Sequence, residues 1–175
     1  MSDKRAPKII SKTGYKGVAY CHQGWVLDRN NQAWMIMDDE YDEMTGRGPE
    51  PAKHPTTYIW NITSLEHPVN TGFFKGTVAS VDHNQYIYNG LSYQSNYGSG
   101  LRVVDVRSIP EDPTGKSVRE IGFFDIYPND DAQPDGGSAK FAGSWSSYSN
   151  FPSGYIFVNT IERGGFVVKI RDMPQ

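Results

Sequence analysis

The stretch that decides the fold class is residues 100–106, GLRVVDV. A glycine precedes closely spaced β-branched residues, and a polar break at Arg107 and Ser108 follows, which is typical of a β-strand. The same pattern returns at residues 164–170, GGFVVKI, and an earlier version lies at residues 57–62, TYIWNI. Because the neighbouring segments also match, the strand belongs to an internal repeat, and such a repeat determines the architecture.

Each copy of this strand lies in a similar unit. Another strand-like segment precedes it, and a polar, aromatic segment opens the unit at His22, His83 and Trp145. His22 and His83 are 61 positions apart, and His83 and Trp145 are 62 positions apart. Four strands per unit are typical of a propeller blade, whose usual period is about 40–50 residues, so these blades carry insertions.

The sequence therefore predicts an all-β chain without helices. Its strands form one partial β-propeller domain of about three four-stranded antiparallel blades. We place the blades at residues 17–76, 78–126 and 139–172. Two connections, residues 41–55 and 127–143, are longer than usual, and such insertions lie on the faces where propellers contact ligands.

The repeated unit resembles the LVIVD-repeat β-propellers. Five runs resemble the choice-of-anchor B family more narrowly: residues 20–25, 38–40, 82–84, 96–102 and 161–164. The resemblance covers residues 7 to 170 and corresponds to the C-terminal part of the family domain. It implies an extracellular or cell-surface propeller, with further blades and a signal peptide upstream.

Composition narrows the classes of function. The chain has 175 residues and a net charge of −3, so nothing indicates nucleic-acid binding. Cys21 is the single cysteine, which allows no intrachain disulfide. No run of apolar residues reaches the length of a membrane span, and residues 1–5 lack the apolar segment of a signal peptide.

The two ends of the chain predict an incomplete ring. Residues 7–15 resemble an outer strand, either of a preceding blade or of the last blade if the ring closes. Propellers typically have about 4–8 blades, so three blades leave apolar sheet faces open. We expect either missing upstream blades or a second copy, in a homodimer, to cover them. The aromatic residues expected on these faces are Trp25, Trp60, Tyr93, Phe123 and Phe157.

Polar side chains gather where the first strand of each blade begins. The second strand runs antiparallel beside the first, so its end lies next to this point. All three units place such groups at one mouth of the central channel. The candidate ligand-binding residues there are His22, Asp38, Asp39, Glu40, Asp82, His83, Asn96, Trp145 and Glu162.

Two interpretations of this cluster stay open. His22, Asp39 and His83 have the donor atoms to hold a divalent metal with open positions, and such a metal can activate water. Alternatively, the polar groups only satisfy one another's hydrogen bonds. The chain has no His-Glu-x-x-His, Gly-x-Ser-x-Gly or phosphate-binding glycine motif. The sequence favours a non-catalytic module that binds a partner protein or a glycan, with a metal-dependent hydrolase or lyase as the alternative.

Overall fold

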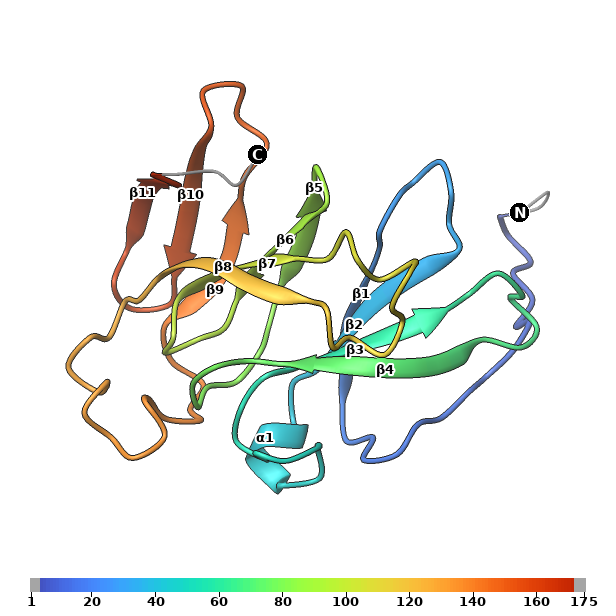
Figure 1. The fold of residues 1–175 in the computed structure, drawn as a ribbon, viewed down its shortest axis with the longest axis horizontal. Coiled ribbons are helices and arrows are strands. Elements are labelled where there is room, and N and C mark those ends of the chain that lie inside the picture. Colours follow the sequence, from blue (N-terminus) through green and yellow to red (C-terminus); the bar gives the residue numbers. More distant parts are fainter. Residues whose placement is uncertain (1–3, 172–175) are drawn as a thin grey trace.

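Three antiparallel sheets make up the computed structural model, which describes residues 4–171 (Figure 1). Sheet A contains β1 (Cys21–Val26), β2 (Trp34–Asp39), β3 (Thr56–Asn61) and β4 (Val69–Lys75). Sheet B contains β5 (Gln85–Tyr88), β6 (Leu91–Ser95), β7 (Leu101–Asp105) and β8 (Arg119–Phe124). Sheet C contains β9 (Ser144–Tyr148), β10 (Tyr155–Thr160) and β11 (Gly165–Lys169). The all-β prediction is confirmed, but the described strands close into neither a barrel nor a propeller ring.

Sheet B is packed between the other two sheets. Ile36 and Ile59 of sheet A join Val104 of β7 in one buried cluster, together with Val106, Ile109 and Val118 from the connection between β7 and β8. A second cluster joins side chains of β6 and β7 to Ile156 and Val158 of β10. Each such aliphatic side chain contributes about 1.5–3 kcal/mol when it is fully buried.

The position of sheet B between the other two sheets explains which strand residues are buried. Every residue of β6 is buried because sheet B is covered on both faces. In β10, exposed and buried residues alternate from Tyr155 to Val158, because one face of sheet C is open. A strand covered on one side shows this period of two.

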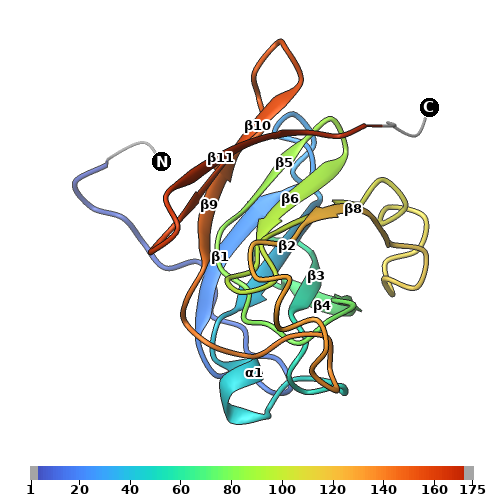
Figure 2. The ribbon, with the colours of Figure 1, turned by 90° about the vertical axis from the view of Figure 1, so that its left-hand side faces the viewer.

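The first strands of the three sheets lie next to one another. β5 contacts both β1 and β9, and the three are central in Figure 2. The ends of these strands can therefore bring side chains from all three sheets to one place.

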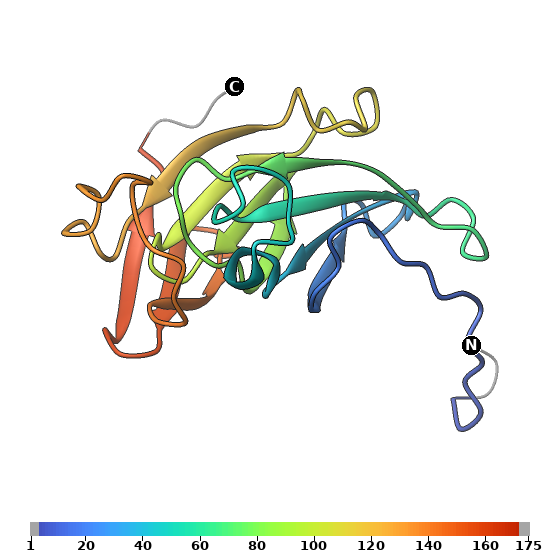
Figure 3. The same ribbon diagram turned by 90° about the horizontal axis from the view of Figure 1, so that it is seen from below.

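The N-terminal segment differs from the prediction. Residues 7–15 form no strand, and Ile9 is 90% exposed. Tyr15 packs against Tyr58 and Trp60 of β3, with ring centroids 4.6 and 5.6 Å away. The segment therefore lies beside sheet A, at the end of the molecule opposite sheet C (Figure 3). Sheet C consequently has three strands, not the expected four.

A short helix also departs from the prediction of none. α1 (Asp42–Thr45) is followed by Gly46 in the left-handed conformation, which ends the helix. Its carboxylate Asp42 accepts a hydrogen bond from the Tyr58 hydroxyl at 2.6 Å, so α1 is fixed to sheet A. Among residues 4–171, no helix is long and apolar enough to cross a membrane.

The prediction of aromatic residues on open sheet faces is correct only in part. Trp25, Phe123 and Phe157 are exposed, but of the three only Phe157 lies on an open outer face, that of sheet C. Trp25 contacts Tyr86 of sheet B, and Phe123 belongs to the central sheet B. Trp60 and Tyr93 are buried, contrary to expectation. Tyr15 covers Trp60, and Tyr93 lies in the cluster between sheets B and C.

Candidate functional site

Strand ends from all three sheets build the candidate site. Cys21 at the start of β1 pairs with Asp39 at the end of β2, which brings His22 close to Asp38 and Glu40. His83 comes two residues before β5, and Trp145 is the second residue of β9. Because β5 lies beside both β1 and β9, side chains that are far apart in the sequence meet here.

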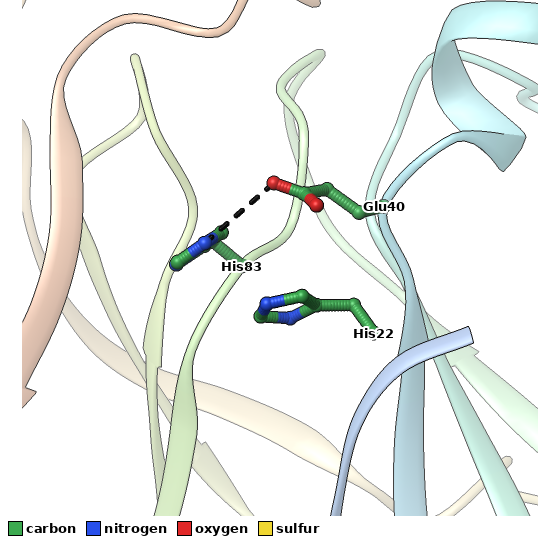
Figure 4. Close-up of side chains that lie close together, drawn as sticks. All are labelled: His22, Glu40 and His83. Atoms are coloured by element: carbon green, nitrogen blue, oxygen red, sulfur yellow. Dashed lines mark ion pairs between the residues drawn. The ribbon is translucent and has the colours of Figure 1, made fainter. Parts of the chain in front are cut away.

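His22, Glu40 and His83 form the centre of the site (Figure 4). Each offers one nitrogen or oxygen atom, and these atoms all lie within 4.8 Å of one another. The two imidazole rings are stacked, with centroids 4.3 Å apart and planes at 30°. His83 Nε2 lies 3.6 Å from Glu40 Oε1. His22 is the most accessible of the three, with a side chain that is 21% exposed.

Backbone and aromatic groups hold His83 in place. Its Nδ1 lies 2.7 Å from the carbonyl oxygen of Trp145, and the Trp145 ring packs against the imidazole at a centroid distance of 4.1 Å. A carbonyl oxygen can only accept, so Nδ1 carries the proton. Burial lowers the pKa of His83, with a smaller contribution from the nearby His22. The His83 ring is therefore neutral, and its lone pair is on Nε2.

Glu40 is oriented from the opposite side. The Tyr97 hydroxyl donates to Glu40 Oε1 at 2.6 Å, and burial together with this bond raises the pKa of Tyr97. The Tyr97 ring also meets His83 edge-on, with centroids 5.2 Å apart. Tyr97 therefore fixes the carboxylate beside the imidazole.

Asp38 lies next to His22. Its Oδ1 accepts the Gln23 backbone N–H at 2.6 Å, and its Oδ2 accepts from Gln85 Nε2 at 3.3 Å. The carboxylate is 3.5 Å from His22 Nδ1 and raises the pKa of His22. Burial in turn raises the pKa of Asp38 to about 6.

Asp39 does not join the cluster, although the sequence placed it among the metal ligands. Its Oδ2 accepts from the Tyr15 hydroxyl at 2.5 Å and the Ala19 N–H at 2.7 Å, and its Oδ1 accepts the Tyr20 N–H at 2.5 Å. These bonds use the carboxylate to anchor the N-terminal segment. The cluster with metal-ligand spacing contains Glu40 in its place.

The remaining predicted residues fall into two groups. Asp82 and Asn96 are buried beside His83, along with Gln94. Both carboxylate oxygens of Asp82 lack a hydrogen-bond partner among the described residues, and burial raises its pKa well above the ordinary value. Glu162 lies outside the cluster, where it accepts from the Tyr127 hydroxyl and from the Gly143 N–H.

A hollow of about 520 Å³ adjoins the cluster. Glu40 forms part of its wall, and the rest is made by Ala19 and three half-exposed aromatic residues, Tyr20, Tyr41 and Phe141. None of these three aromatic residues was among the predicted ligand-binding residues. Tyr41 and Phe141 do lie in the two long connections, residues 41–55 and 127–143, which were expected to contact ligands.

Comparisons with family models, curated proteins and solved structures found no match to the chain.

Proposed function

We propose that the protein is a non-catalytic binding module built from three blade-like sheets of a β-propeller. Two observations support this assignment. Each sheet is a meander of consecutive antiparallel strands, and the first strands of the three sheets lie side by side. The resemblance to LVIVD-repeat and choice-of-anchor B proteins adds an extracellular or cell-surface location to the proposal.

The hollow beside Glu40 is the proposed ligand site, and it is the observation that carries this function. Tyr20, Tyr41 and Phe141 present exposed rings around a carboxylate. A sugar ring suits this lining, because its C–H faces pack on aromatic rings while its hydroxyls donate to the carboxylate. We therefore propose a glycan as the ligand.

Replacing Phe141 by alanine tests the site. We expect the variant to lose about 10- to 100-fold in affinity for glycans that the native protein retains on a saccharide array, because one ring face is lost. Phe151→Ala is the matched control: Phe141 is 42% exposed and Phe151 is 44% exposed, and Phe151 packs on Tyr148, away from the hollow. Equal retention by both variants, or no retained glycan with the native protein, contradicts the proposal.

A metal-dependent hydrolase or lyase is the second candidate, favoured by the spacing of His22, Glu40 and His83. The two functions differ in the fate of the ligand. Mass spectrometry after incubation with zinc should recover a bound glycan unchanged if the protein is a binding module. Cleaved products would support the enzyme instead.

The open face of sheet C is the proposed contact with a second copy of the chain. Phe157 pairs with Tyr148 on one side and with Val167 on the other, so the three exposed side chains form an apolar row. The corresponding face of sheet A is covered in its middle, where Tyr15 packs on Tyr58 and Trp60. With one open face among the sheets that the structure describes, two copies can pair through the same surface in a closed dimer.

Light scattering tests this contact. We expect the native protein to form a concentration-dependent dimer and Val167→Lys to remain a monomer, because the dimer would bury an unpaired charge. Val69→Lys is the control: Val69 lies on β4 of sheet A and is 54% exposed, against 67% for Val167. A native monomer at all concentrations, or a dimer that persists in Val167→Lys, would rule the contact out.

A further inference from the structure

Two hydrogen-bond acceptors face each other at the centre of the candidate site. His83 donates its Nδ1–H to the Trp145 carbonyl, so in the neutral ring Nε2 presents a lone pair. Glu40 Oε1, which accepts from the Tyr97 hydroxyl, lies 3.6 Å from that lone pair. Both groups are shielded from water, with side chains 5% and 11% exposed. Two acceptors at this distance repel each other unless a positive centre lies between them.

The spacing of the pair suits a metal ion. Ligands about 2.0–2.2 Å from a tetrahedral zinc lie roughly 3.3–3.6 Å from each other. The observed 3.6 Å between His83 Nε2 and Glu40 Oε1 lies at the upper end of that range. Trp145 and Tyr97 already act as the supporting partners that orient an imidazole and a carboxylate at metal sites.

His22 supplies a third ligand. Its ligand atom is within 4.8 Å of those of Glu40 and His83. Its Nδ1 lies 3.5 Å from Asp38 Oδ1 but makes no hydrogen bond among residues 4–171. Its ring is stacked on His83, so it must turn to direct a nitrogen at an ion held by the other two. The partial exposure of the His22 side chain leaves room for that rotation.

We infer that His22, Glu40 and His83 bind one divalent transition-metal ion, with zinc as the best fit. Two imidazoles and one carboxylate are the ligand set of several zinc sites that keep a fourth position open. Calcium and magnesium are disfavoured because they take oxygen ligands. Glu40 also lines the hollow, so the open position would face it. This inference goes beyond the proposed glycan binding and does not depend on it.

Titration of chelator-stripped protein with zinc alone tests the site. Calorimetry should show one equivalent bound with a dissociation constant below about 1 μM. Glu40→Gln and His83→Gln should each weaken binding by about 100-fold or more, since each removes a ligand. His67→Gln is the control because His67 is an exposed histidine outside the cluster.

A measurement on the native protein covers the case in which a variant fails to fold. The chain has four histidines, at positions 22, 54, 67 and 83. Zinc should shift the imidazole resonances of His22 and His83 and leave those of His54 and His67 unchanged. No binding at about 100 μM zinc, or shifts confined to His54 and His67, would overturn the inference. Glycan binding measured with and without chelator is a separate readout, so either proposal can fail alone.

Discussion

Replacing Glu43 by glutamine should raise the stability of the protein at neutral pH. Glu43 is buried in α1, where its Oε1 accepts the Thr56 N–H at 3.1 Å and its Oε2 has no donor among residues 4–171. Burial, with repulsion from Asp82 and Asp42, raises the pKa of Glu43 from 4.5 to about 12. The carboxyl group therefore keeps its proton in the folded protein at neutral pH, whereas the unfolded chain releases it.

The direction of the pH effect follows from this difference. Between the two pKa values the folded state binds one more proton than the unfolded state, so stability falls as pH rises above about 4.5. Glutamine keeps the shape of a protonated glutamate and does not titrate. Its carbonyl can accept from Thr56 and its amide can donate to Asp42 Oδ1, which also has no donor in the described part of the chain. We expect a gain of about 1–3 kcal/mol at neutral pH, at roughly 1.4 kcal/mol per pKa unit.

Chemical denaturation at about pH 5 and about pH 8 measures the effect, and the gain should be larger at the higher pH. Comparing both proteins at the same pH cancels the other titrating groups, such as Lys75, whose pKa burial lowers. Glu111→Gln, at an exposed position, is the control and should change little. A Glu43→Gln protein that is no more stable than the native one at the higher pH would show that Glu43 is ionised in the fold.

The sheets were predictable because their signals are local. β-branched and aromatic residues at short spacing predicted strands such as β7 and β10, and the structure has strands there. The N-terminal segment was misassigned for a physical reason. Ile9 and Ile10 have strand propensity, but both are exposed and neither belongs to a strand. Propensity alone did not specify pairing, because the segment is held by Tyr15 on the face of sheet A.

The candidate site was likewise predictable only where a local sequence signal exists. The antiparallel pairing of β1 and β2 correctly placed His22 beside the end of β2. The choice between Asp39 and Glu40 depends on side-chain alternation: residues 38 and 40 share one face of an extended chain, and residue 39 points to the other. That signal was present in the sequence and favoured Glu40. Phe141 had no comparable signal, because a long loop has no period from which its direction could be read.

Replacing Gly115 by alanine should destabilise the protein more than replacing Gly164 by alanine, because two sheets meet at the backbone of Gly115. Gly115 has φ +83°, and a Cβ there would overlap the Phe73 carbonyl oxygen and lie 2.7 Å from its carbon. The loop between β7 and β8 rests on β4 at this point. The Thr114 carbonyl accepts the Phe73 N–H at 3.3 Å, and the Thr71 hydroxyl donates to the Pro113 carbonyl at 2.8 Å.

Gly164→Ala is the control, because it measures the cost of the backbone conformation without the overlap with Phe73. Gly164 has a similar φ of +74°, but no atom of the described residues lies within 4 Å of the Cβ position. Alanine in this conformation costs about 1–2 kcal/mol, which is the loss expected for Gly164→Ala. Gly115→Ala must also push the loop off β4 and weaken its hydrogen bonds, each worth about 0.5–1.5 kcal/mol, so we expect a loss of about 3–5 kcal/mol. Thermal melts of the two variants measure the difference, and equal losses would mean that the contact between sheets A and B yields without cost.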